Sequence, residues 1–236
     1  MKKLKMICRW ILISIILQIA AFSYINFIYL TGNARVKATA YEPETGALKS
    51  RSMVLPEEAL NPKVSFDGLY AAYIIGDELI IADIESEKAI KTINPAKGAV
   101  SCYRWLPDRE MLIYSIKEPD GKTGQVLIST YDIIPALDRS YPKIKGLPAG
   151  STIVNIELSP LTNVVYPIIK TGKKEAEVYK FDIMDNLTYI MSASLSTVFK
   201  ETMYTDALIF QTPDGLIRVR NGKTGKTSLL PAKDAK

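Results

Sequence analysis

The chain has 236 residues, a formal net charge of +5 at pH 7 and no histidine. The absence of histidine excludes Ser-His-Asp and Cys-His catalysis, histidine-ligated zinc and proton transfer by imidazole. The first 30 residues contain no acidic residue and four basic ones: Lys2, Lys3, Lys5 and Arg9. Residues 31–236 therefore carry a net charge of only +1, and they lack the basic bias that favours nucleic acid.

The stretch from Trp10 to Leu30 holds 21 residues without a charge. As a helix it would be about 31 Å long, which matches a bilayer core of about 30 Å. Positive charge before the span keeps the N-terminus in the cytoplasm. The sequence thus predicts a cytoplasmic tail at residues 1–9, a transmembrane helix at 10–30, and an extracytoplasmic chain in a single-pass membrane protein.

A cleaved signal peptide is the alternative to an anchor. Ala38-Thr39-Ala40 has the small-x-small form of a cleavage site, which would leave a mature protein beginning at Tyr41. The apolar run, however, is longer than the roughly 7–15 residues of a signal peptide. The uncleaved anchor is therefore favoured.

Residues 31–62 have mixed charge, three prolines and no sustained periodicity, so they are predicted to form a linker. Residues 63–230 form the predicted outer domain, and 231–236 form a C-terminal tail. The chain has two cysteines, Cys8 and Cys102, and Cys8 precedes the span. The outer domain is therefore not expected to contain an internal disulfide.

From residue 63 onward, short runs of Val, Ile, Tyr and Leu alternate with Gly, Pro, Asp and Asn, as in strands joined by turns. A unit recurs four times, with a turn, an apolar strand, a hairpin and a second strand. The proposed repeat-core aromatics are 41, 52 and 44 residues apart: Tyr73, Tyr114, Tyr166 and Phe210. The second strands of the first three units close on an Asp-Ile pair that begins the next turn: Asp83, Asp132 and Asp182.

Each unit also has a strand before it and a short strand after it, the latter predicted at 88–93, 141–146, 187–192 and 226–230. Four antiparallel strands in 40–50 residues is the period of a β-propeller blade. One such sheet cannot bury both faces alone, whereas stacked sheets cover one another. The sequence therefore predicts an all-β, propeller-like domain of about four blades, in a closed ring or an open arc.

The turns Phe66-Asp67-Gly68, Leu106-Pro107-Asp108 and Ser159-Pro160 stand before Tyr73, Tyr114 and Tyr166. This pattern resembles the Ser-Pro-Asp-Gly repeat of TolB and dipeptidyl-peptidase-IV-like β-propellers. No unit has the whole motif, and the third is one residue shorter between its proline and its tyrosine. The resemblance implies a propeller of stacked blades, although those families usually have six to eight.

Few motifs suggest chemistry. Residues 222–227 read GKTGKT, but a phosphate-binding P-loop would need glycine where Arg220 stands, so we interpret them as a turn. The repeated aspartates are expected to cap their turns rather than to bind cations. Trp105, beside a turn, is the candidate for an exposed contact. No catalytic residue, cofactor or metal site is expected.

The favoured function is a non-catalytic, membrane-tethered interaction or scaffold module at the outer face of a cytoplasmic membrane, with a bacterial envelope as its setting. The expected partners are the bilayer and a protein, including a second copy of the chain. One alternative is a sensor or regulatory subunit of a membrane complex. The other is a peptidase-related accessory protein, which is disfavoured because the chain has neither histidine nor a G-x-S-x-G motif.

Overall fold

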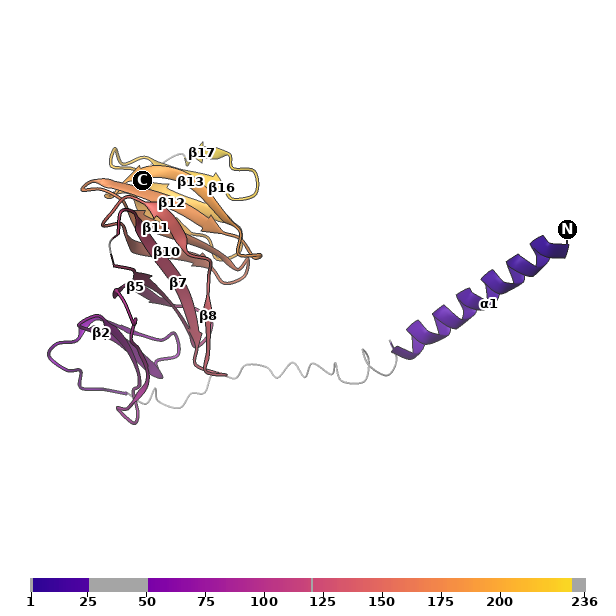
Figure 1. Ribbon diagram of the computed structural model, residues 1–236, viewed down its shortest axis with the longest axis horizontal. Coiled ribbons are helices and arrows are strands. Elements are labelled where there is room, and N and C mark those ends of the chain that lie inside the picture. Colours follow the sequence, from indigo (N-terminus) through magenta and orange to yellow (C-terminus); the bar gives the residue numbers. More distant parts are fainter. Residues whose placement is uncertain (1, 26–50, 120, 231–236) are drawn as a thin grey trace, which may run out of the picture. The chain divides into compact units, whose positions relative to one another are not determined.

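The computed structural model describes residues 2–25, 51–119 and 121–230. The chain divides into two compact units, Met1–Lys49 and Ser50–Lys236, each of which is described by itself (Figure 1). The first unit contributes one helix, and the second contributes all the strands.

Helix α1 spans Lys2–Ile25 and begins eight residues before the predicted span. Lysine, leucine and methionine favour helix, so the basic tail continues the helical turn of the apolar stretch. Met6–Ile25 is long and apolar enough to cross a membrane, and it fits both an anchor and a signal sequence. Leu30, the predicted end of the span, lies outside the described residues, as does most of the predicted linker.

The strands of the second unit form four antiparallel sheets in chain order. The first sheet contains β1 (Leu60–Val64), β2 (Tyr70–Ile75), β3 (Glu78–Asp83) and β4 (Ala89–Ile93). The second contains β5 (Ala99–Trp105), β6 (Met111–Lys117), β7 (Gly124–Asp132), β8 (Leu137–Ser140) and β9 (Ile144–Leu147). The third contains β10 (Thr152–Ser159), β11 (Val164–Lys170), β12 (Glu175–Phe181) and β13 (Leu187–Ser194). The fourth contains β14 (Val198–Glu201), β15 (Ala207–Gln211), β16 (Ile217–Asn221) and β17 (Thr227–Leu229).

Two boundaries differ from the prediction. Strand β1 begins at Leu60, inside the predicted linker. Its hydrogen bonds to β2 hold these residues in a strand, although their mixed composition does not predict one. The strand predicted at 141–146 begins instead at Ile144, as β9, and a further strand, β8, precedes it. Both pair with the nine-residue β7. Pro142 stands between them, and proline has no N–H to continue a ladder.

Three apolar cores lie between consecutive sheets. Ile81 and Leu112 belong to the core between the first and second sheets, and Ile128 and Ile156 to the core between the second and third. Val178 and Leu208 belong to the core between the third and fourth. Within the described part of the chain, no such core joins the fourth sheet to the first.

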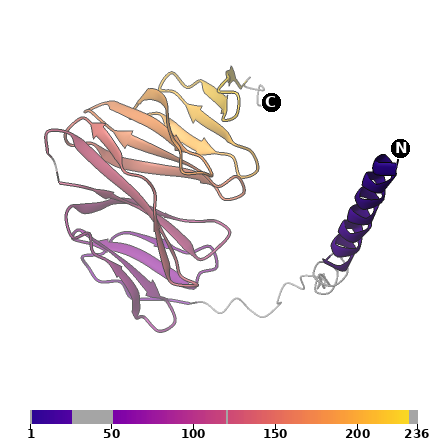
Figure 2. The ribbon, with the colours of Figure 1, turned by 45° about the vertical axis from the view of Figure 1, so that its right-hand side comes forward.

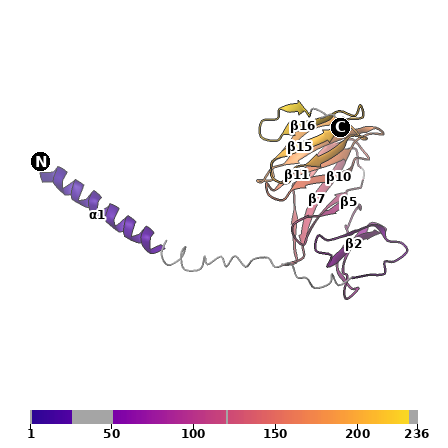
Figure 3. The same ribbon diagram turned by 180° about the vertical axis from the view of Figure 1, so that it is seen from behind.

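The domain is therefore an open arc of four blades. The first and fourth sheets stand at opposite ends of the stack when viewed from two directions (Figures 1 and 2). The view from behind shows the same order (Figure 3). Three interfaces bury the inward faces of the end sheets and both faces of the middle sheets, which explains the continuous apolar runs in the strands.

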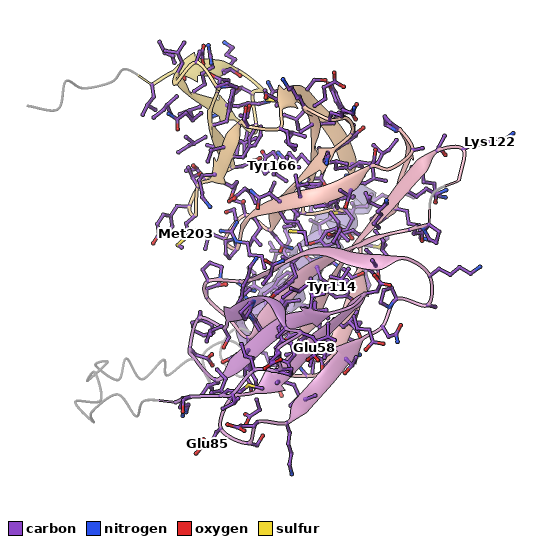
Figure 4. All side chains as sticks on the ribbon, turned by 90° about the vertical axis from the view of Figure 1, so that its left-hand side faces the viewer. Glu58, Glu85, Tyr114, Lys122, Tyr166 and Met203 are labelled. Carbon is purple, nitrogen blue, oxygen red and sulfur yellow. The ribbon has the colours of Figure 1, made fainter. Side chains whose placement is uncertain are left out.

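The strand order places turns of two kinds on two sides of the stack. Turns from the first to the second strand and from the third to the fourth strand of each blade lie on one side, which we call the turn face. Turns from the second to the third strand lie on the opposite side, which we call the lysine face. Glu85 and Met203 mark the turn face and Lys122 marks the lysine face (Figure 4).

Candidate interaction surfaces

The repeated aspartates cap the turns of the turn face. Asp83 accepts hydrogen bonds from the backbone N–H and the hydroxyl of Ser86, both at 2.7 Å. Asp182 accepts from the backbone N–H of Asn186 at 3.0 Å, and Asp132 from the N–H two residues on. Hydrogen bonds from Ser86 and Asn186 lower the pKa of the Asp83 and Asp182 carboxyls. These local bonds account for the recurrence of aspartate at the ends of the strands.

The four repeat aromatics are buried in strands: Tyr73, Tyr114, Tyr166 and Phe210. They do not all occupy one repeat position. Tyr114 and Phe210 face the preceding sheet, and Tyr73 lies on the outer face of the first sheet. Tyr166 instead faces the following sheet, because the third unit has one residue fewer after its proline and a shift of one residue reverses the face.

Trp105 is buried rather than exposed, so its prediction as a contact residue is wrong. Only 7% of its surface is accessible, and its ring stacks on Tyr70 with centroids 6.5 Å apart. Its indole N–H donates to the carbonyl oxygen of Lys63 at 3.1 Å. Trp105 lies at the end of β5, and its side chain points into the core between the first and second sheets. The stacking of the two sheets buries it, and its position next to a turn does not reveal this.

Large apolar side chains are exposed at the tips of the turn face. Tyr204 is 75% exposed, Met184 76%, Leu161 70% and Ile134 70%. These four residues come from turns of the second, third and fourth sheets, and Ile183 and Met203 are exposed beside them. Separate exposed apolar residues are common, whereas a group of them on one side of a domain makes that side a candidate interaction surface.

A pocket of about 320 Å³ opens on the turn face between the second and third sheets. Its walls are mostly apolar and include Leu106, Met111, Tyr141, Leu158 and Val164. The volume is at the lower end of the range for ligand pockets, and the combination of an apolar floor with a few polar groups is typical of them.

Two arginines stand at the rim of this pocket. Arg109 pairs with Asp108, and Arg139 pairs with Asp185, each with N–O separations of 2.7 Å. Asp132 lines the same rim. Both arginines are already neutralised by carboxylates, so the rim has no surplus of positive charge that would select an anion.

The two faces of the stack differ in charge. Carboxylates outnumber cations on the turn face, which carries Asp67, Asp83, Glu85, Glu87, Asp108, Glu110, Asp132, Asp182, Asp185 and Asp206. Lysines predominate on the opposite face, which carries Lys97, Lys117, Lys122, Lys143, Lys145, Lys170, Lys173 and Lys174. The small net charge of the domain therefore conceals two oppositely charged faces.

An ion pair and a hydrogen bond connect the fourth sheet to the third. Asp206, in the turn after β14, accepts a hydrogen bond from Tyr166 at 2.5 Å and forms an ion pair with Lys180. The Asp206 and Lys180 side chains are only 8% and 14% exposed. This pair is buried, so the loss of one member would leave an uncompensated charge.

A second carboxylate links three sheets. Glu157 on β10 is buried, and it binds Arg104 of the second sheet at 2.9 Å and Lys200 of the fourth at 3.2 Å. Glu201 lies near Glu157 and Asp206, and neither of its buried carboxylate oxygens has a hydrogen-bond partner among the described residues. Burial first, and then the two neighbouring carboxylates, raise the pKa of Glu201 to about 8.

The chain before β1 crosses the first sheet. Arg51 lies 4.0 Å from Glu85, which is in the turn after β3 on the turn face. Nine residues later, Leu60 pairs with Ile74 on the opposite side of the sheet. Because the inward face of this sheet packs on the second sheet, residues 51–59 must cross the outward one.

Burial supports this path. The outward-pointing side chains Ala71, Tyr73 and Ala82 are all buried, although they lie outside the core between the sheets. Met53 and Leu55, from the crossing segment, are half-buried. The first end of the arc is therefore covered by the protein's own chain.

The outer face of the fourth sheet has no comparable cover within the described residues. The pairing of β14 to β16 places Val198, Ile209, Ile217 and Val219 on this face, and Leu230 follows beside Ile217. Val198 is 58% exposed, Leu230 49% and Ile217 39%, and the other two are half-buried. We call these five residues the end face.

Among the described residues, no group of three or more histidine, cysteine or acidic side chains has a geometry that could hold a metal ion. Cys102 is a free thiol whose pKa is raised by burial.

No family model and no curated protein matches the sequence. A solved structure of Porphyromonas gingivalis dipeptidyl peptidase 4 is similar, with a TM-score of 0.51 and 9% identity over 75% of this chain and 33% of that one. The RRP9 WD40 repeats give a TM-score of 0.49 and 14% identity, over 76% and 53%. A putative dipeptidyl aminopeptidase IV from Bacteroides ovatus gives 0.47 and 13%, over 76% and 34%.

The chain thus spans a third to about half of these proteins. At such low identity the likeness to the Porphyromonas structure, together with four antiparallel sheets, supports a β-propeller-like fold. It carries no information on activity.

Proposed function

We propose that this protein is a non-catalytic, membrane-tethered interaction module whose turn face receives a protein partner. The observation that supports this most directly is the group of exposed apolar side chains at the tips of the turn face, on the same side of the domain as a mostly apolar pocket. Turns carried by a rigid set of sheets are a common location for binding residues. Such a partner would be anchored in the same membrane or belong to the surrounding envelope.

The chemistry of the face suggests the kind of segment that binds there. The pocket between the second and third sheets has room for one or two apolar side chains. The carboxylates around it favour lysine or arginine on either side of such an anchor, because complementary charges steer association. We therefore expect a partner segment in which a large apolar residue is flanked by basic ones.

The proposed location is the outer face of a bacterial cytoplasmic membrane. Helix α1, with basic residues before its apolar span, supports an anchor with a cytoplasmic N-terminus. Protease added to intact cells or spheroplasts should digest the strand domain and leave the N-terminus protected. A mature chain that begins at Tyr41 would contradict the anchor.

Photo-crosslinking within membranes tests the binding surface. A photoreactive residue at Leu161 of the full chain should give a discrete heavier adduct, whereas one at Lys122 on the lysine face should not. Substitution Met184→Asp should abolish the adduct from position 161, because it places a charge beside the apolar surface. Equal adducts from both positions, or none from position 161, would contradict the proposal.

Two other functions give different results. A sensor or regulatory subunit would also give an adduct at position 161, but the loss of its partner would change the activity of a membrane complex. A peptidase-related protein would require the purified full chain to hydrolyse dipeptidyl substrates, and we expect no hydrolysis because the chain has no histidine.

A further inference from the structure

We propose that the end face of the fourth sheet is the contact between two copies of this chain, which pair through the same face about a twofold axis. The proposal concerns the end of the arc and does not depend on what binds the turn face. It follows from the sheet stacking, the cover over the first sheet and the charge of the end face.

The end face continues the pattern of the interfaces already in the stack. Each preceding sheet buries a face of Val, Ile, Leu and aromatic side chains against the next one. The fourth sheet presents Val, Ile and Leu side chains on its outer face, of which Val198 is 58% exposed. Apolar sheet faces that remain accessible mark interfaces, and a second sheet is the partner that such a face accepts.

The cover over the first sheet decides how copies can join. If both ends were bare, the fourth sheet of one copy could stack on the first sheet of the next, and the chain would form open-ended assemblies. Residues 51–59 cross the outer face of the first sheet and block that contact. Only contact between two fourth sheets remains, and it is complete with two copies.

The charge of the end face also fits a second copy. None of its five residues is charged, and the polar side chains beside them, Gln211 and Ser228, are neutral. Lys200 lies on the same side of β14, the edge strand of the sheet, and its side chain is 65% exposed although it pairs with Glu157. The five uncharged residues can meet those of a second copy while Lys200 stays at the edge of the contact, and tethering to one membrane raises the effective concentration of the two faces.

The mass of the full chain in detergent micelles tests the proposal. Sedimentation should give a dimer. Ile217→Lys and Val198→Lys should each raise its dissociation constant at least about tenfold, because they place charges within a desolvated contact. Leu161→Lys, a control on the turn face, should leave the dimer unchanged.

The circular dichroism spectrum of each variant should match that of the original chain, since both substituted positions are exposed. Having two variants guards against one that fails to fold. A monomeric original chain, a dimer unaffected by both substitutions, or a ladder of larger assemblies would overturn the proposal.

Cysteine crosslinking in native membranes gives an independent measurement. In a Cys8→Ser background, Ser228→Cys should form an adduct between two copies with a short bifunctional maleimide, and Thr224→Cys in a turn should not. An adduct from position 228 that contains a different protein would assign the end face to another partner and overturn the twofold contact.

Discussion

The first and fourth sheets are the two ends of the same stack, but their outer faces differ in how much of their apolar surface is covered. On the first sheet, Tyr73 is buried under a segment that the chain supplies before β1. On the fourth sheet, Ile217 and Leu230 are accessible, and no described segment crosses them. Terminal units of stacked proteins need a cover, and the second copy proposed above would give the fourth sheet what residues 51–59 give the first.

The two ends are also attached differently. Tyr103 and Trp105 anchor the first sheet by hydrogen bonds to backbone carbonyl oxygens within an apolar core. The fourth sheet has a smaller apolar core, and it is held in addition by the buried pair of Lys180 and Asp206. The attachment of the fourth sheet should therefore be more sensitive to charge and pH than that of the first.

The largest expected effect tests the cover over the first sheet. Tyr73→Ala should lower the free energy of unfolding by about 3–5 kcal/mol, as for other buried aromatics. Ile217→Ala on the end face should cost less than about 1 kcal/mol in dilute protein, because the side chain is already accessible. Denaturant unfolding measures both, and equal losses would contradict the difference between the two ends.

The next effect concerns the ionic attachment. Lys180→Met should lower the free energy of unfolding by about 3 kcal/mol, because it leaves the buried Asp206 carboxylate without its cation. The double variant Lys180→Met/Asp206→Leu should recover much of that loss. Hydrogen exchange should then show faster exchange in β15 and β16 of the single variant, whereas uniform exchange throughout the domain would argue against a local role.

A smaller effect tests the crossing segment itself. Leu55→Ser should cost about 1 kcal/mol, since the side chain is half-buried. Val54→Ser is the matched control, because Val54 is 83% exposed and should have no effect. Loss of the cover should also allow assemblies larger than a dimer, and their absence at high protein concentration would show that residues 51–59 do not block the first sheet.

A further effect is a pH dependence at the fourth sheet. The folded pKa of Glu201 is about 8, above its ordinary value of 4.5, so between these values the folded state binds more protons than the unfolded state. Stability should therefore fall as the pH rises through this window. Glu201→Gln should flatten that slope in thermal unfolding and raise stability at pH 8. Because the chain has no histidine, no imidazole titration overlaps this pH range. An unchanged slope in the Glu201→Gln variant would contradict the assignment of this pH dependence to Glu201.

Local pattern was sufficient to predict most of the strands and the turns between them. Asp83, Asp132 and Asp182 cap turns through bonds that reach at most four residues along the chain, so the sequence contains all that those contacts require. The number of blades followed from the period of the repeat in the same way. The presence of two short strands, β8 and β9, at the edge of the second sheet could not be predicted in this way. It depends on the length of β7, which pairs with β8 over one part and with β9 over another.

The candidate surfaces were less accessible to sequence reasoning. The exposed turn residues, such as Met184 and Tyr204, were missed, although their place beside Asp-Ile pairs and turn residues was a usable signal. The pocket and the end face gave no signal, since each combines side chains from different strands. The link from Glu157 to Arg104 and Lys200 joins residues more than 40 positions apart.

By itself, the sequence determined an apolar N-terminal helix and four repeated units of antiparallel strands, because both follow from hydrophobic periodicity and turn chemistry within short windows. Only the tertiary structure decided which face each strand buries. It turned Tyr166 toward the fourth sheet and Trp105 toward the first, and it placed residues 51–59 over one end of the arc while leaving the other uncovered. These outcomes depend on how whole sheets stack, and a face changes with a shift of one residue that local propensity does not determine.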